Sequence, residues 1–198
     1  MRGWLQRVLQ RALQRIWRAL FGPRMFYGWR RADGVWLAHT RMASTTCVDT
    51  PALLDIGDHV YVGHYNLLDA SGGLHIGEGC QVTTHCALLT HSSHHGLRLA
   101  GRQYWGASDP PGFVRQATHI GEYSFIGAHC VVMPGSRIGR GVIVRAFSYV
   151  DGEVADFAIV AGQPAVMVGD TREVDAAWLA THPQDRAAYE AWAGRAPR

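Results

Sequence analysis

Residues 120–150 read IGEYSFIGAHCVVMPGSRIGRGVIVRAFSYV. Aliphatic residues recur here at every sixth position, and an earlier stretch follows the same spacing with one two-residue shift; the twelve positions are 56, 62, 68, 76, 82, 88, 120, 126, 132, 138, 144 and 150. Glycine follows the aliphatic residue at positions 57, 63, 77, 121, 127 and 139. Such a fixed period is the sequence signature of a repeat fold.

A six-residue period indicates a left-handed parallel β-helix. Three six-residue sides would close one triangular coil, whose aliphatic side chains point inward, whose turns glycine relieves, and whose neighbours stack about 4.8 Å away. The small residue four positions after the aliphatic residue would lie inside near a corner, so Cys80, Cys86 and Cys130 are expected to be structural. With a weaker spacing at 36, 42, 48 and 54, the expected fold is mainly β, with about five coils within residues 23–170.

The six-residue period fails between Leu88 and Ile120, so about residues 91–117 are expected to leave the coils as a loop. Loops this long in a compact domain are usually functional. His91, His94 and His95 cluster where the loop begins, and an imidazole can accept a proton near neutral pH. We expect one of the three to be a catalytic base, with His94 foremost and His91 and His95 as alternatives.

The same loop is rich in arginine and aromatic residues, namely Arg98, Arg102, Tyr104 and Trp105. Aromatic faces stack on sugar rings, and guanidinium groups donate to hydroxyls or carboxylates. These four residues are therefore candidates for acceptor binding. The alternative is that Tyr104 and Trp105 cover a hydrophobic edge of the coils.

Charge divides the chain of 198 residues into two parts. All 19 basic residues are arginine, so lysine chemistry is excluded. Residues 1–31 contain eight arginines and no acidic residue, whereas the remainder has 11 arginines and 16 acidic residues, a net charge of −5. A basic arm thus precedes a mildly acidic body, for which no nucleic-acid partner is expected.

Residues 1–22 have the pattern of a basic amphipathic helix, with Trp4 and Trp17 on the apolar face and Gly22-Pro23 at its end. Residues 2–21 suit the surface of an anionic membrane. Packing on the chain's own domain or on a partner subunit, or an arginine-rich organelle presequence, are the alternatives.

Four irregularly spaced cysteines and the lack of a signal peptide or of a long apolar run favour the cytoplasm. We expect a peripheral position on the inner face of the cytoplasmic membrane. Within residues 171–198, two helical pieces are expected at about 174–180 and 184–193.

The repeats, the loop and the terminal VAGQPA (160–165) together resemble the hexapeptide acyltransferases. The segments 90–105, THSSHHGLRLAGRQYW, and 161–175, AGQPAVMVGDTREVD, are most similar to acetyltransferases of bacterial surface-polysaccharide and O-antigen gene clusters. The resemblance covers about residues 40–175. It implies a homotrimer that uses acetyl-CoA, without a metal, to acetylate a sugar hydroxyl of a surface polysaccharide or of its lipid-linked precursor.

The resemblance also implies roles for particular residues. The family's base is a histidine where the loop leaves the coil; alignment along the coil places Ser93 there, and a shift of one residue favours His94. On the acceptor side, GHYNLLD (63–69) offers His64 and Asn66, with Asp69 near the acidic partner of the base.

On the donor side, the resemblance implies a pantetheine groove along EYSFIGAHCVVMPG (122–135) and an oxyanion that accepts the backbone N–H of Ala128. The other implied contacts to coenzyme A come from Phe125, Gly127, Arg145 or Arg172, Ala146, Gly162, Gln163 and Pro164. Transfer would be direct, with the histidine as general base and no covalent enzyme intermediate.

Two other classes of function remain open. The same fold supports zinc-dependent, carbonic-anhydrase-like hydratases, and His59 and His64 have a suggestive spacing for zinc ligands. A non-catalytic, membrane-docked scaffold is the other alternative. Bound metal would favour the first, and failure to bind coenzyme A would favour the second.

Overall fold

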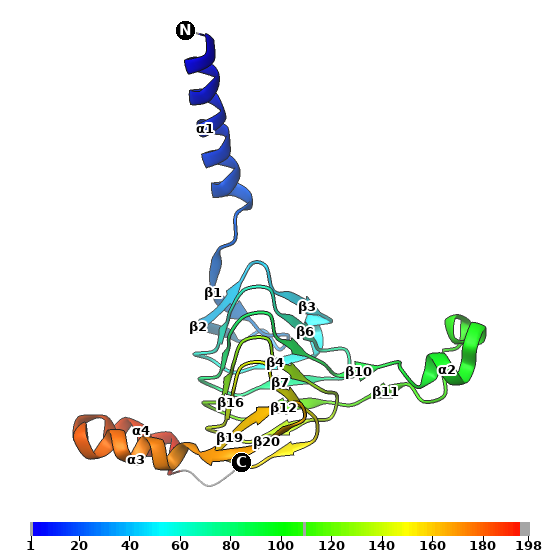
Figure 1. The fold of residues 1–198 in the computed structure, drawn as a ribbon, viewed down its shortest axis with the longest axis vertical. Coiled ribbons are helices and arrows are strands. Elements are labelled where there is room, and N and C mark those ends of the chain that lie inside the picture. The colour runs from blue at the N-terminus through cyan, green and yellow to red at the C-terminus, as the bar shows by residue number, and fades with distance from the viewer. Residues whose placement is uncertain (1, 109, 195–198) are drawn as a thin grey trace.

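The computed structural model describes residues 2–108 and 110–194, with side chains from residue 9 onward. Three sheets of mostly parallel strands form the sides of a triangular prism, from which a helix, a loop and a helical pair project (Figure 1). The expected left-handed β-helix of about five coils is confirmed, since each of two sides contains five parallel strands.

The first side, sheet A, continues at both ends into antiparallel hairpins. Its strands, in spatial order, are β1 (Met25–Arg30), β2 (Trp36–Ala43), β5 (Tyr61–Val62), β8 (Gln81–Val82), β13 (Phe125–Ile126), β16 (Ile143–Val144), β19 (Ala158–Gly162) and β20 (Ala165–Asp170). The hairpins β1–β2 and β19–β20 cover the two ends of the stack, where a repeat fold would otherwise expose unpaired backbone.

Sheets B and C form the other two sides. Sheet B consists of β3 (Cys47–Asp49), β6 (Leu67–Asp69), β9 (Ala87–Leu88), β14 (Val131–Val132) and β17 (Tyr149–Val150). Sheet C consists of β4 (Leu54–Ile56), β7 (Leu74–Ile76), β12 (Thr118–Ile120), β15 (Arg137–Ile138) and β18 (Glu153–Val154). The aliphatic residues of the repeat fill the interior: Ile56, Val62, Leu68, Val82, Leu88, Ile126, Val132 and Val144, for example, are all buried.

Coil length explains the shift in the repeat. Val62 pairs with Val82, twenty residues later, whereas Ile126 pairs with Val144, eighteen residues later. The extra residues enlarge the corner between sheets B and C, where residues 70–73 connect β6 to β7. This enlarged corner is also the place where the loop leaves the prism.

The glycines of the repeat have a different structural role from the expected relief of turns. The backbone angle φ is positive at residues such as His59, Tyr65, His85 and His129, rather than at the glycines that follow the aliphatic residues. A Cβ on Gly127 would lie 2.5 Å from the backbone nitrogen of Ala146 in the next coil. These glycines therefore permit close approach between coils, and a side chain there would push the coils apart.

The expectation for the inward cysteines is confirmed. Cys80, Cys86 and Cys130 are buried. Burial raises the pKa of the Cys80 thiol to about 12 and that of Cys130 to about 11. Because a thiolate is the reactive form of cysteine, the raised pKa values agree with the expected structural role.

The segments outside the prism are helical or loop-like. They comprise α1 (Arg2–Phe21), the 3-10 turn η1 (Pro51–Leu53), the loop strands β10 (His91–Ser92) and β11 (Val114–Arg115), α2 (Gly96–Ala100), η2 (Gly101–Gly106), α3 (Thr171–Thr181), η3 (Pro183–Asp185) and α4 (Arg186–Ala193).

The helix α3 begins three residues before the expected start at about 174. Asp170 accepts a hydrogen bond from the backbone N–H of Arg172 and so caps the helix at this earlier position. Trp192 of α4 stacks on Tyr123, with ring centroids 4.7 Å apart, which attaches this pair to the prism.

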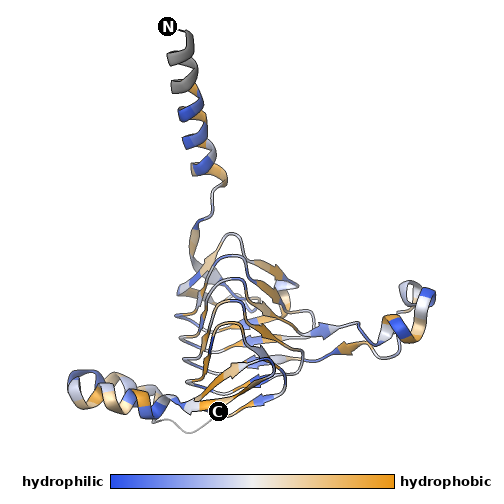
Figure 2. Cartoon of the chain, viewed as in Figure 1, coloured by the Kyte–Doolittle hydropathy of each residue, from blue (hydrophilic) through white to orange (hydrophobic). Residues whose placement is uncertain are grey.

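The helix α1 projects from the end of the prism (Figure 1). Its described part has one hydrophobic and one hydrophilic side (Figure 2), and the hydrophobic side chains are more than half exposed: Leu9, Leu13, Ile16, Trp17, Leu20 and Phe21. The helix therefore does not pack on its own domain, which was one of the alternatives. The expected position of the Trp4 side chain lies outside the described residues. In the described part of the chain, no helix has the length and apolar content needed to cross a membrane.

Candidate active site

Asp69 and His91 meet at the enlarged corner between sheets B and C. Asp69 ends β6, and His91 begins β10, directly after the chain has left β9. The Nδ1 atom of His91 lies 2.7 Å from Oδ2 of Asp69 and 3.0 Å from the Ser71 hydroxyl. The pair is therefore set by the stacking of two successive coils, since the two residues lie 22 positions apart in the chain.

Asp69 is a buried carboxylate with several hydrogen bonds, and only 2% of its side chain is exposed. Burial by itself would raise its pKa, but hydrogen bonds from the backbone N–H of Thr90 and from Ser71 outweigh that effect, so the pKa of Asp69 lies well below its ordinary value. Oδ2 also accepts the backbone N–H of His91, at 3.1 Å. Asp69 is thus ionised at neutral pH.

An ionised carboxylate only accepts hydrogen bonds, so Nδ1 of His91 must carry the proton that lies between them. Nε2 is then the basic atom of the ring. The His91 side chain is 40% exposed, which allows a hydroxyl group to approach Nε2. A histidine oriented in this way by a buried carboxylate has the arrangement of a general base.

His94 and His95 have different surroundings. Nδ1 of His94 lies 2.6 Å from the Ser92 hydroxyl, and both rings are exposed on the outer part of the loop, 4.2 Å apart. His95 lies 3.4 Å from the Arg98 guanidinium, which is a cation rather than an acid. Among the three candidates from the sequence, only His91 has a carboxylate partner within the described residues, and the preference for His94 has no such support.

Asn66 lies inside the prism, where the coil uses its whole amide. Its Nδ2 donates to the carbonyl oxygens of Gly63 and Thr83, both at 2.9 Å, and its Oδ1 accepts the N–H of Cys86 at 2.7 Å. The structure therefore assigns Asn66 to the stability of the coil instead of the acceptor contact expected from the sequence. His64 is partly exposed at the corner between β5 and β6, 2.9 Å from the Thr45 hydroxyl, and so lies at the opposite end of β6 from Asp69.

The extruded loop carries an aromatic cleft. Its neck is the pair β10–β11, in which His91 pairs with Arg115, and the Phe113 ring packs against the His91 ring at 5.8 Å. A cleft of about 500 Å³ lies further out, lined by Tyr104, Trp105, Ala107, Ser108, Pro110, Phe113 and Arg115. Trp105 is 90% exposed, so it does not cover an edge of the coils. Arg98 and Arg102 are exposed on α2 and η2.

The donor-side candidates gather at another corner of the prism, between sheets A and B. Gly127 and Ala128 follow β13, Arg145 and Ala146 follow β16 one coil later, and the side-chain amide of Gln163 donates to the carbonyl oxygen of Phe147 at 2.7 Å. In the described part of the chain, no acceptor is found for the backbone N–H of Ala128. Because His91 lies at the corner between sheets B and C, one chain does not bring base and donor residues together.

The remaining donor-side candidates lie along the same corner. Gly162 and Pro164 form the tip of the β19–β20 hairpin beside Gln163, and Phe125 points outward from β13, 38% exposed. Arg172 is paired with Asp170, so Arg145, whose side chain is exposed, is the better placed cation for a phosphate group.

The three outer faces of the prism differ in chemistry. The outward residues of sheet B form an apolar column of Cys47, Leu67, Ala87, Val131 and Tyr149. The outward residues of sheet C form a charged column of Asp55, His75, His119, Arg137 and Glu153. Sheet A carries Tyr61, Phe125 and Ile143 among its outward residues. The outer faces of sheets A and B are thus suited to burial, and the outer face of sheet C is suited to contact with solvent.

Comparison with known families agrees with this fold. Residues 117–152 match the family described as bacterial transferase hexapeptide (six repeats). Residues 117–152 thus carry the hexapeptide repeat that this family model describes. The matched segment covers two of the five strands of sheet C and includes five of the donor-side candidates, Phe125, Gly127, Ala128, Arg145 and Ala146.

The curated relatives to which this chain is similar include acetyltransferases. Serine acetyltransferase 4 of Arabidopsis thaliana is 28% identical over 69% of this chain and 35% of its own length. A putative lipopolysaccharide biosynthesis O-acetyl transferase of Escherichia coli, WbbJ, is 27% identical over 56% of this chain and 57% of its own length. The chain therefore spans about a third of the length of the first relative and little more than half of the second.

Solved structures share the fold. A hexapeptide-repeat acetyltransferase from Vibrio cholerae, in complex with acetyl coenzyme A, superposes with a TM-score of 0.54 at 23% identity, over 63% of this chain and 67% of that one. The N-acyltransferase AntD from Bacillus cereus, in complex with dTDP and 3-hydroxybutyryl-CoA, superposes with a TM-score of 0.53 at 16% identity, over 73% and 89%.

The zinc ligands expected for a hydratase do not converge. His59 lies at the corner between sheets C and A, after β4, whereas His64 lies at the corner between sheets A and B, after β5. The two imidazoles therefore lie on opposite ends of one side of the prism. This arrangement gives no support to the hydratase alternative.

Proposed function

We propose that the protein is an acetyl-CoA-dependent O-acetyltransferase that acts on a sugar hydroxyl of a surface polysaccharide or of its lipid-linked precursor. The observation that carries the proposal is the Asp69–His91 pair at the base of the extruded loop. The acetyltransferase relatives, among them one in lipopolysaccharide biosynthesis, support the reaction class, and the arginines and exposed aromatic rings of the loop support a saccharide acceptor.

The proposed reaction is a direct transfer. Nε2 of His91 takes the proton of the acceptor hydroxyl, whose oxygen bonds to the thioester carbonyl carbon. The tetrahedral oxyanion accepts the N–H of Ala128, a type of contact worth about 3–4 kcal/mol. The carbon–sulfur bond then breaks, and the departing thiolate of coenzyme A takes the proton back from His91. Asp69 stabilises the transient imidazolium.

We propose a homotrimer because the two halves of the site lie at different corners of one chain. In a threefold assembly each subunit buries two faces and keeps one open, which fits the apolar column of sheet B, the aromatic residues of sheet A and the charged column of sheet C. The corner that carries His91 would then face the donor-side corner of a neighbour. Leu67→Arg should dissociate the trimer and abolish transfer, whereas His75→Arg, at the equivalent outward position of sheet C, should do neither, as measured by light scattering and by activity.

We further propose that α1 binds the surface of an anionic membrane, where lipid-linked acceptors would lie. Its exposed apolar residues and the arginines Arg11, Arg15 and Arg18 support this position. The full chain should float with anionic vesicles, and a chain lacking residues 1–22 should not. Equal flotation of the two would contradict membrane binding and leave a partner subunit or a targeting role for α1.

Calorimetric titration of the full-length protein with acetyl-CoA tests the proposal most directly, because it requires no knowledge of the acceptor. We expect saturable binding, and activity on at least one saccharide acceptor that His94→Ala retains. Absence of binding at millimolar acetyl-CoA would overturn the transferase and favour the scaffold alternative.

A further inference from the structure

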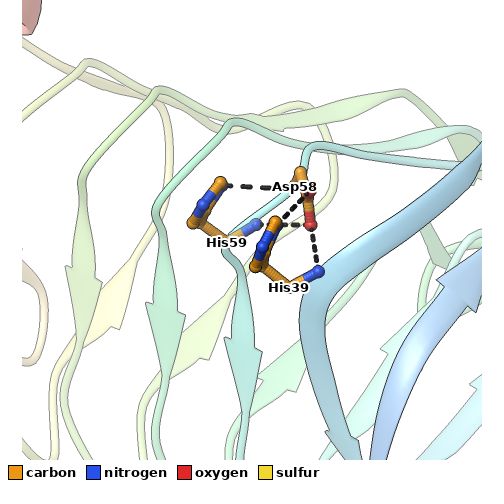
Figure 3. Close-up of side chains that lie close together, drawn as sticks. All are labelled: His39, Asp58 and His59. Carbon is orange, nitrogen blue, oxygen red and sulfur yellow. Dashed lines mark hydrogen bonds and ion pairs between the residues drawn. The ribbon is translucent and has the colours of Figure 1, made fainter.

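A second histidine–carboxylate cluster lies on the end coil that joins the prism to α1. His39 belongs to β2, and Asp58 and His59 form the turn between β4 and β5, at the corner between sheets C and A. One side-chain ligand atom from each of the three residues lies within 4.8 Å of the other two. Figure 3 shows the two imidazoles side by side, both directed toward the carboxylate of Asp58. Because His91 is at a different corner, this cluster takes no part in the proposed acetyl transfer.

The carboxylate of Asp58 is held in place by the backbone. Its Oδ1 accepts the N–H of His39 at 2.9 Å and the N–H of His59 at 2.8 Å. Its Oδ2 faces the two rings, 3.0 Å from Nδ1 of His39 and 4.0 Å from Nδ1 of His59. One oxygen thus fixes the side chain, while the other is directed at two nitrogen atoms that can donate a lone pair to a metal ion.

The electrostatics also favour a cation. Burial by itself would raise the pKa of Asp58, but the hydrogen bonds from His39, His59 and Thr40 hold the pKa well below its ordinary value. Arg31 and Asp58 both line a cleft along sheet C, but Arg31 is paired with Asp33 and Asp55 rather than with Asp58. The negative charge at the cluster is therefore available to a metal ion.

We propose that His39, Asp58 and His59 bind a divalent transition-metal ion such as Zn²⁺. Two imidazole nitrogens and one carboxylate oxygen are ligands that zinc prefers, with water in the fourth position. The rings are now stacked, with centroids 4.4 Å apart, and each is more than half exposed. Each ring can therefore turn so that its Nδ1 points at an ion that replaces the proton between His39 and Asp58.

The ion would connect the first coil to the second. His39 lies beside the hairpin β1–β2 that leads to α1, and His59 precedes β5, the strand that pairs with β2. The end coil of a repeat fold lacks one stacking neighbour. A cross-link there therefore stabilises the fold more than one in the middle of the stack. The expected consequence is a zinc-dependent rise in the thermal stability of the prism.

The test is calorimetric titration of the full-length protein with zinc chloride, after removal of any polyhistidine tag and treatment with a chelator. Asp58→Asn retains an oxygen for the two backbone N–H groups, and His59→Asn suits the positive φ of 60° at that position. His75→Ala is the matched control, because His75 also contacts an aspartate, at 3.2 Å, and stacks on a second histidine.

We expect one zinc ion per wild-type chain, affinity at least tenfold weaker in Asp58→Asn and His59→Asn, and unchanged affinity in His75→Ala. Zinc should raise the Tm of the wild type but not of the two site variants, whose circular dichroism should remain that of the wild type. Equal affinity in wild type and Asp58→Asn, or equal weakening by His75→Ala, would overturn the proposal.

Discussion

The Asp69–His91 pair and the His39–Asp58–His59 cluster both combine an aspartate with histidine, and their differences show how the same side chains serve different chemistry. Asp69 is almost completely buried and meets one imidazole, whereas Asp58 is 28% exposed and faces two. In both, backbone N–H groups fix the carboxylate. The first arrangement leaves one basic nitrogen directed outward, as a general base requires, and the second directs two nitrogens and an oxygen to one point, as a cation requires.

The largest expected effect is on the rate of acetyl transfer, which should depend on the Asp69–His91 pair and not on the His39–Asp58–His59 cluster. His91→Asn removes the base and should reduce kcat/KM for acetyl transfer by about 10²–10⁴-fold, because general-base catalysis contributes that much. His39→Asn should leave the rate within about threefold of the wild type, since general acid–base effects require contact with the reacting proton. Steady-state kinetics with the best acceptor measures both. A wild-type rate in His91→Asn would show that His91 is not the general base.

A smaller effect is expected at the aspartates. Asp69→Asn keeps an acceptor for Nδ1–H of His91 but removes the charge that stabilises the imidazolium, so kcat/KM should fall roughly 10–100-fold. Steady-state kinetics measures this change, and circular dichroism shows whether the variant keeps the wild-type fold. Asp58→Asn serves as the control, with an unchanged rate. A wild-type rate in a folded Asp69→Asn variant would contradict the role assigned to Asp69.

Metal removal should also distinguish the clusters. Chelator treatment should lower the Tm through the His39–Asp58–His59 cluster and leave kcat at a temperature below the transition unchanged, because the proposed transfer uses no metal. Differential scanning calorimetry and an activity assay on the same sample give the two values. If the chelator abolished activity and zinc restored it, the claim that the metal takes no part in acetyl transfer would be wrong.

The smallest effect concerns acid stability. The pKa values of Asp69 and Asp58 are both lowered in the folded protein, so each contributes stability that is fully present above the unfolded-state pKa near 4 and is lost as pH falls through the folded-state value. The free-energy difference between wild type and either asparagine variant should therefore shrink below pH 4. Urea unfolding at pH 7 and pH 3 measures this change; a difference that grows in acid would contradict the assigned direction.

The sequence predicted the fold well because periodicity is a local property. The aliphatic residues at every sixth position face inward in the structure, and the inward cysteines are buried as expected. The loop was visible as a failure of the same period. The reason for the repeat glycines was not visible, because it depends on the distance between coils, as at Gly127 and Ala146.

The sequence predicted the candidate site less completely. It identified three histidines and placed Asp69 near the base, but it favoured His94 and assigned Asn66 to the acceptor. It did not identify the cluster of His39, Asp58 and His59. The signal that could have found it is the coil length: His39 and His59 are twenty residues apart, the separation of the paired residues Arg41 and Tyr61.

By itself, then, the sequence determined the β-helix, its interior, the position of the loop and the amphipathic character of α1. Only the tertiary structure decided which histidine meets a carboxylate and which corner each candidate occupies. The physical reason is that inward or outward direction follows from the local backbone period. Contact between Asp69 and His91, or between Asp58 and His39, instead depends on how many residues each coil contains and on how successive coils stack.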